Sequence, residues 1–249
     1  MRIIQFVSIL TIGVIGVVSD VSRPLQFATM FARISDELDH MSLGNCNLSA
    51  AALPVNNTKV KLPTPSSSLN LKYVALGRGT QNYSCSTSNS SAKPVAVGAA
   101  AALFDASCLA SASMTLLHEV PAVIRRTSLG SLAFMAEMLS LTTNKTDLII
   151  GEHYFDASGD PYFDLRLGGA NAWMVATKKA SVDAPIKDAN SCSNVSSEDV
   201  AWLELERKTG NGVERVYRVM TSGGSPPLTC AGQNKSVLIK YAAEYWFYG

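Results

Sequence analysis

"ALGRGTQNYSC", residues 75–85, is compatible with two architectures, a nucleotide-binding loop and a corner between strands of a β protein. A dinucleotide fingerprint needs a third glycine and a helix directly after the loop. Asn82 occupies the position of that glycine, and "TQNYSC" has strand-forming residues where the helix would start. Without a helix N-terminus there are no aligned backbone amides to hold a pyrophosphate. We therefore expect two strands around a Gly-Arg-Gly turn, no cofactor, and not an NAD-dependent dehydrogenase.

Short apolar and aromatic runs separated by turn residues continue to the end of the chain. They cover residues 94–107, 147–156, 161–167, 171–179, 199–207, 213–221 and 236–248. β-branched and aromatic residues favour strands, and "ASGD" (157–160) and "TGNG" (209–212) have the composition of hairpin turns. Because helices do not alternate with these strands, the pattern predicts an antiparallel β-sandwich or barrel over residues 69–249.

One region interrupts the strand pattern. Within residues 109–143, apolar residues recur near helical spacing after Ser128, which is placed to cap a helix; they are Leu129, Leu132, Met135 and Leu139. The fold class is therefore mainly β with a helical insertion at about 109–143.

The N-terminus has the pattern of an export signal. Arg2 precedes an apolar run over residues 3–18, which is shorter than the roughly 20 residues that a membrane span needs. Residues 1–19 are therefore predicted to be a signal peptide, with no membrane span after its removal. Residues 20–68 then form an N-terminal arm, with a short helix or a poorly ordered stretch over 22–42 and a Pro/Ser-rich connector.

Composition supports export and argues against nucleic-acid binding. The net charge is +1 and only 16% of residues are charged, whereas a nucleic-acid binder needs a concentrated basic face. Seven Asn-x-Ser/Thr sequons predict glycosylation, at Asn47, Asn56, Asn82, Asn89, Asn144, Asn194 and Asn234. The expected location is secreted, extracellular or in the cell wall.

The cysteines favour disulfides over metal or redox chemistry. There are five, Cys46, Cys85, Cys108, Cys192 and Cys230, and no two have C-x-x-C spacing. An odd number leaves one that is free, capped or paired between chains. No metal site is predicted from them.

Two other segments contain candidate site residues. "GEHYFDASGDPYFD" (151–164) brings Glu152, His153, Asp156 and Asp160 close in sequence, as a metal-dependent or acid–base enzyme requires, although a hairpin turn explains the same residues. Near the C-terminus, Trp246 and Tyr248 are candidates for stacking against a sugar, although a terminal aromatic strand also suits a core.

Four blocks in order resemble the DUF3455 family, an uncharacterised family of secreted proteins from fungi and bacteria. They are "LKYVALGRGTQNYSC", "GEHYFDASGDPYFDL", "VAWLELERKTGNGVERVYRVMTSGGSPPLTC" and "VLIKYAAEYWFYG", and the resemblance covers about residues 45–249. "GAAAALFDASC" and an "NC" segment resemble the fungal branch. Some members have a malate dehydrogenase label, which the failed cofactor loop does not support.

The resemblance also implies a disulfide pattern. It pairs Cys85 with Cys230 and Cys46 with Cys108, which leaves Cys192 as the odd thiol. The sequence thus favours a secreted, glycosylated β protein without catalysis, whose partner is cell-wall carbohydrate or a surface protein. The alternative is an extracellular hydrolase or metal-dependent enzyme built on the 152–164 cluster.

Overall fold

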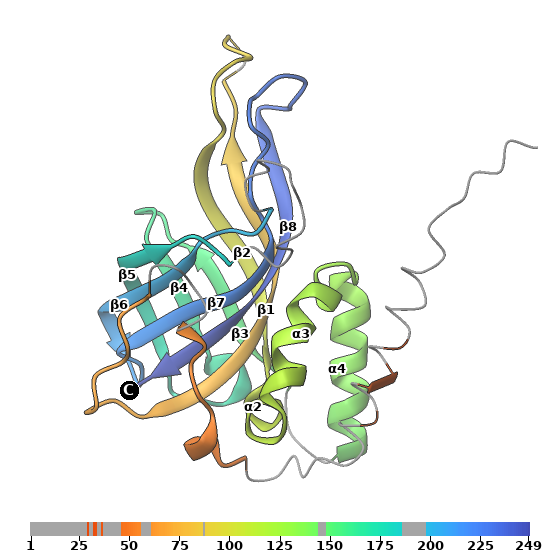
Figure 1. The fold of residues 1–249 in the computed structure, drawn as a ribbon, viewed down its shortest axis with the longest axis vertical. Coiled ribbons are helices and arrows are strands. Elements are labelled where there is room, and N and C mark those ends of the chain that lie inside the picture. The colour runs from red at the N-terminus through yellow and green to blue at the C-terminus, as the bar shows by residue number, and fades with distance from the viewer. Residues whose placement is uncertain are drawn as a thin grey trace, which may run out of the picture.

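The computed structural model describes residues 46–55, 61–86, 88–143, 148–185 and 198–249, together with Thr29, Ala32, Arg33 and Asp36. Eight antiparallel strands form a closed barrel in which each strand pairs with its neighbours in the chain and β8 pairs with β1 (Figure 1). The strands are β1 (Leu71–Ser84), β2 (Val95–Asp105), β3 (Ile149–Phe155), β4 (Pro161–Asp164), β5 (Trp173–Val182), β6 (Trp202–Asn211), β7 (Arg215–Gly223) and β8 (Ser236–Tyr248). The predicted β class is confirmed, and of its two forms the barrel is correct.

The predicted Gly-Arg-Gly turn is wrong, because β1 runs straight through these residues and pairs along them with both β2 and β8. The two glycines are needed for space instead of for a turn. A Cβ on Gly77 would overlap the ring of Tyr245 inside the barrel, and a Cβ on Gly79 would overlap the backbone of β2. Both barrel closure and the packing of its interior therefore depend on this motif.

Arg78, between these glycines, points out of the barrel and attaches the helical layer to it. Its Nε donates to the Ile124 carbonyl at 2.9 Å and its Nη2 donates to the Thr127 carbonyl at 3.3 Å. The last carbonyls of a helix lack intrahelical partners. Arg78 donates to one carbonyl at the end of α3 (Met114–Ile124) and to one just after it, and the Ile124 carbonyl also accepts from the Thr127 amide at 3.1 Å.

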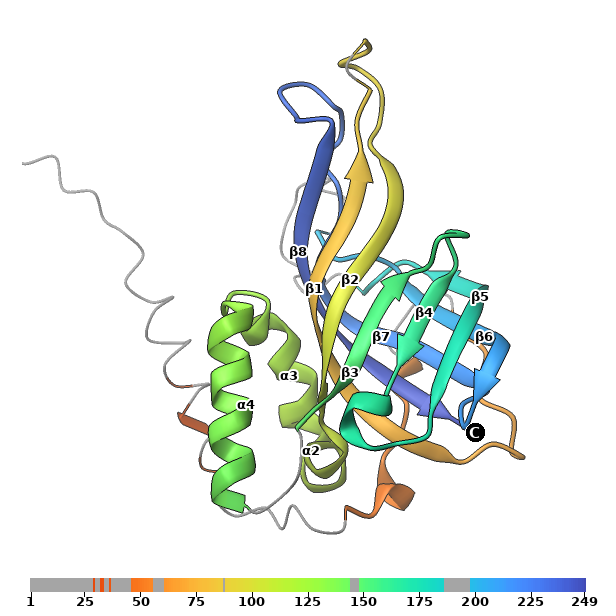
Figure 2. The same ribbon diagram turned by 180° about the vertical axis from the view of Figure 1, so that it is seen from behind.

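The helical insertion lies between β2 and β3 and is confirmed. It comprises α2 (Ser107–Ala112), α3 and α4 (Leu129–Thr143), which stand beside the barrel on one side (Figure 2). Ser128 caps α4 as expected, because its Oγ accepts from the Ser131 amide at 3.0 Å. No helix in the described part of the chain has the length and apolarity to cross a membrane.

The barrel wall separates two cores. The interior is filled by residues such as Leu103, Phe163 and Phe247, while Leu117, Trp246 and other side chains fill the space between the barrel and the helices. Both faces of β8 are consequently buried from Tyr241 onward. This explains why its sequence is apolar without alternation there.

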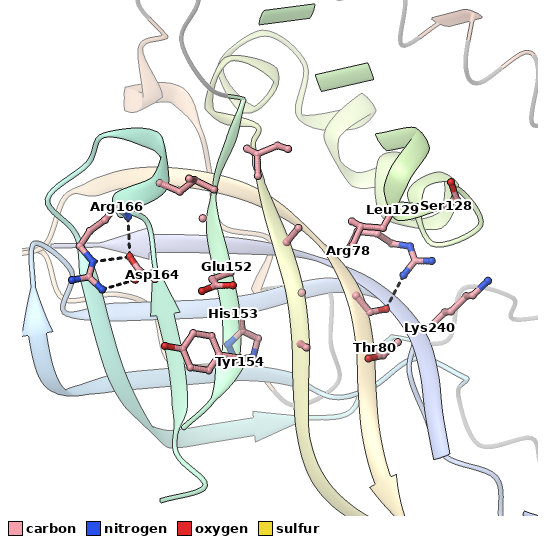
Figure 3. Close-up of a pocket in the computed structure, with 17 residues that line it drawn as sticks. Arg78, Thr80, Ser128, Leu129, Glu152, His153, Tyr154, Asp164, Arg166 and Lys240 are labelled. Atoms are coloured by element: carbon pink, nitrogen blue, oxygen red, sulfur yellow. Dashed lines mark hydrogen bonds and ion pairs between the residues drawn. The ribbon is translucent and has the colours of Figure 1, made fainter. Parts of the chain in front are cut away.

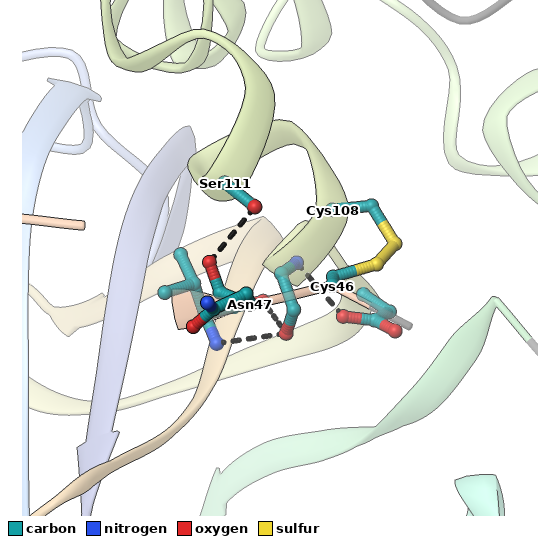
Figure 4. The surroundings of a disulfide bond; sticks show 7 residues. Cys46, Asn47, Cys108 and Ser111 are labelled. Atoms are coloured by element: carbon teal, nitrogen blue, oxygen red, sulfur yellow. Dashed lines mark hydrogen bonds between the residues drawn. A yellow bond between two sulfur atoms is a disulfide. The ribbon is translucent and has the colours of Figure 1, made fainter. Parts of the chain in front are cut away.

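Two disulfides hold peripheral parts of the chain, and they are the two pairs that the family resemblance implies. Cys85–Cys230 lies beyond the ends of β1 and β8, with Cα atoms 5.4 Å apart. Cys46–Cys108 joins the N-terminal arm, next to a 3-10 turn at Leu48–Ala50, to α2, with Cα atoms 4.7 Å apart (Figure 4).

Several predictions lie outside the described residues. They are the signal peptide at 1–19, Cys192, and the sequons at Asn56, Asn144 and Asn194. Of the predicted helix at 22–42, only Thr29, Ala32, Arg33 and Asp36 are described, and all four are helical. Arg33 Nη1 lies 3.1 Å from Glu119 Oε2, which places Arg33 beside α3.

Candidate functional site

A groove of about 1300 Å³ lies on the outer face of β1–β4 (Figure 3). One wall contains Ser128 and Leu129 at the start of α4, and the other contains Arg166 and Leu167 of a 3-10 turn, η3 (Arg166–Gly168). The helical insertion and the β4–β5 connection thus rise on either side of the sheet.

The floor of the groove is made of small residues. Ala100 and Ala102 of β2 face outward, and Gly79 and Gly151 expose backbone beside them. The run "GAAAALF" therefore puts short side chains on the floor as well as inside the barrel. A ligand in this groove can approach the sheet closely, because no large side chain covers the central strands.

A row of aromatic rings borders the groove on β3, β4 and β5. The centroids of Tyr154 and Tyr162 are 4.9 Å apart with planes 20° apart, and those of Tyr162 and Trp173 are 5.8 Å apart with planes 15° apart. All three side chains are half-buried on the outer face of the sheet. Stacking fixes Tyr154, the ring that lines the groove, in one orientation.

An ion pair stands beside this row. Arg166 donates from Nε to Asp164 Oδ1 at 2.9 Å and from Nη2 to Asp164 Oδ2 at 2.5 Å, a bidentate arrangement. The hydrogen bonds from Arg166 hold the pKa of Asp164 below its ordinary value. Arg166 also donates to the Tyr162 hydroxyl at 3.3 Å, and its Cζ lies 5.7 Å from the centre of the Trp173 ring. The charged pair is therefore held in place relative to the rings.

The remaining polar groups of the groove differ in how free they are to bind. Arg78 is occupied by the end of α3, and the Thr80 hydroxyl donates to Asn82 at 2.9 Å. The Glu152 and Lys240 side chains are exposed and project into the groove from β3 and β8. The groove thus has both acidic and basic groups, spaced along its length.

The acidic cluster predicted from residues 152–160 is not assembled. Glu152 faces the groove, whereas His153 points into the barrel, is 4% exposed and stacks on Phe163 at 4.2 Å. Asp156 accepts from the Ser158 amide at 2.8 Å and the Asp160 amide at 3.0 Å, and Asp160 pairs with Lys208 at 2.5 Å. The hairpin interpretation is therefore the correct one. Burial lowers the pKa of His153 to about 4, so this ring is neutral at ordinary pH.

Trp246 and Tyr248 lie in the core that covers the outside of the barrel wall, not on a binding surface. Trp246 is fully buried, and its Nε1 donates to Glu244 Oε2 at 2.9 Å. Tyr248 is 8% exposed and packs edge-on against Tyr217. The core alternative for this strand was right, and the exposed aromatic row lies on β3–β5 instead. Sequence reasoning missed the row, although Tyr154, Tyr162 and Trp173 alternate with the inward-facing residues His153, Phe163 and Met174.

Four of the predicted sequon asparagines are described. Asn47, Asn89 and Asn234 are exposed, and Asn82 is half-buried on the outer face of β1. Asn82, Asn89 and Asn234 lie on or beside the part of β1, β2 and β8 that extends beyond the other strands. Their glycosylation stays a prediction.

A family model described as "Protein of unknown function (DUF3455)" matches residues 65–249. The match begins just before β1 and includes the whole barrel, the helical insertion and the groove. No curated protein and no solved structure matches the chain.

Proposed function

We propose a function for this chain, which belongs to the DUF3455 family, a family of unknown function. The protein is a secreted, glycosylated binding protein that holds a carbohydrate chain in the groove on β1–β4. Through that groove it associates with polysaccharide of the cell wall or cell surface. The observation that carries the proposal is the stacked aromatic row beside a fixed Asp164–Arg166 pair.

The groove supplies the two kinds of contact that sugars use. The apolar face of a pyranose packs against an aromatic ring, and Tyr154 is held for that by its stacking on Tyr162. Sugar hydroxyls form hydrogen bonds with planar charged groups. The bidentate Asp164–Arg166 pair provides such groups in a fixed geometry. Since these groups are ordered before binding, little side-chain entropy is lost on association.

The shape of the groove favours a chain over a single sugar. Its charged and aromatic groups extend from β4 across β1 to Lys240 on β8, and its floor of alanine and glycine leaves the sheet accessible throughout. A volume of about 1300 Å³ exceeds that of typical small-molecule pockets, which are about 300–1000 Å³. Several linked sugar units therefore fit better than one.

Disulfides support the proposed location. Such bonds persist in oxidising compartments and are rare in the cytosol, and the described part of the chain contains two. Cys46–Cys108 joins residues 62 positions apart and fixes the N-terminal arm. Cys85–Cys230 joins residues 145 positions apart and fixes the ends of β1 and β8.

The test is binding of the purified secreted protein to insoluble chitin, β-glucan, mannan and cellulose, followed by calorimetry with matching oligosaccharides. We expect one of these to bind, and Tyr154→Ala to weaken binding at least tenfold. Phe134→Ala, which removes an exposed ring on α4 away from the groove, is the matched control and should bind normally. Equal losses in the two variants, or no binding to any polysaccharide, would refute the proposal.

A further inference from the structure

A second polar cluster lies inside the barrel, on the other side of the wall from the groove. Arg218 on β7 points inward, as Val216 does two residues earlier, and is 8% exposed. Its Nη2 donates to the Ala201 carbonyl at 2.9 Å. Among the described residues, no acidic side chain forms an ion pair with Arg218. A buried guanidinium without a counter-charge is costly, because burial removes its hydration.

Neutral polar groups surround this guanidinium. The Tyr245 hydroxyl interacts with Arg218 and lies 2.8 Å from the Tyr241 hydroxyl, which in turn lies beside Gln81. Burial raises the pKa of both tyrosines, so neither is an anion that could balance Arg218. His153 and Tyr83 also lie within electrostatic reach of Arg218 and are neutral as well.

Two donors of this cluster are poorly satisfied. Arg218 Nε and Gln81 Nε2 are buried without a partner at full hydrogen-bond geometry in the described chain, although the Gln81 amide lies within reach of the Tyr241 hydroxyl. Buried donors in native proteins nearly always have a partner. Although the phenol oxygens can also accept, a guanidinium, an amide and two hydroxyls together offer more N–H and O–H donors than the described neighbours offer acceptors.

We propose that Arg218, Gln81 and the Tyr241–Tyr245 hydroxyl pair hold a small oxyanion, a carboxylate or a phosphate group, inside the barrel. The guanidinium supplies the charge and the two poorly satisfied N–H groups supply directed hydrogen bonds. The ligand group is small, because apolar side chains such as Phe163, Met174 and Phe247 fill the rest of the interior. Gln81 is half-buried, and it marks the side from which the group enters.

The proposal is tested by titrating the full secreted chain with phosphate and, separately, with acetate at constant ionic strength against chloride. The Arg218 Nε–H resonance in nitrogen-15 NMR should shift saturably with one of them, and the thermal midpoint should rise with its concentration. The anion that saturates at the lower concentration shows whether the site prefers a carboxylate or a phosphate. No saturable shift with either anion would assign these donors to water and overturn the proposal.

Variants separate this site from general anion effects. Arg218→Met should abolish the anion-dependent rise in the midpoint, whereas Arg126→Met, which removes an exposed arginine just after α3, should retain it. If Arg218→Met does not fold, Gln81→Leu removes one N–H group and should weaken the anion at least threefold. An undiminished response in Arg218→Met or in Gln81→Leu would also overturn the proposal.

Discussion

Replacing Arg78 by methionine tests how the helical insertion is attached to the barrel. Methionine keeps most of the apolar contact of the arginine stem but leaves the Thr127 carbonyl without its donor, while the Ile124 carbonyl keeps only the Thr127 amide, at 3.1 Å. A buried acceptor left unsatisfied costs about 1–3 kcal/mol. The Arg78 charge is itself unfavourable, because burial and repulsion by Arg125 both lower its pKa. Methionine removes that charge, which offsets part of the cost. The expected net loss is about 1–3 kcal/mol of unfolding free energy.

Urea denaturation followed by circular dichroism measures this loss, with Arg126→Met as the control. Arg126 lies at the same end of α3 but is exposed, so its replacement should leave the midpoint unchanged. A loss below about 0.5 kcal/mol for Arg78→Met, as for an ordinary surface substitution, would show that Arg78 does not hold the end of α3. Equal losses for the two variants would refute the specific role of Arg78.

The other predictions concern packing, crosslinking and pH. Gly79→Ala should prevent secretion of folded protein, because its Cβ would overlap the β2 backbone, whereas Gly130→Ala, which meets no atom within 4 Å, should be secreted normally; immunoblotting of the medium compares them. Cys230→Ser should lower unfolding free energy by about 4–5 kcal/mol in the chain-entropy model, measured by denaturation without reductant. His153 has a pKa of about 4 in the folded protein against 6.5 for an ordinary histidine. As the pH drops from 6.5 to about 4, the unfolded chain binds a proton at His153 that the folded chain does not, so the free energy of unfolding falls. That loss is about 3 kcal/mol, and His153→Phe should reduce the slope of denaturation midpoint against pH in this window; an unchanged slope would contradict it.

The strands could be predicted from sequence because their signals are local. Alternation and turn residues identified the hairpins around residues 157–160 and 209–212, and the helical spacing after Ser128 identified α4. Closure into a barrel was not decided, because it depends on pairing β1 with β8 from the far end of the chain. The same reason explains the error at Gly77 and Gly79, whose close neighbours Tyr245 and Ala100 are distant in sequence.

The candidate site was harder to predict than the fold. Residues 152–160 looked like a site because acidic residues and a histidine are dense there, yet strand alternation and the turn send their side chains in different directions. Tyr154, Tyr162 and Trp173 each look like ordinary strand residues, and only the register of three strands makes them neighbours. For Trp246 the sequence left sugar stacking and core both open, because the helices that bury the outer face of β8 come from a distant part of the chain.

The most direct test of the groove is to map a bound wall oligosaccharide on the isotopically labelled protein by amide NMR. Perturbed amides are predicted to cluster on β3, β4 and η3 around Tyr154, Asp164 and Arg166, with smaller changes near Lys240. Perturbations confined to α4 or to the extended ends of β1, β2 and β8 would contradict the account, as would a spectrum unchanged at saturating oligosaccharide.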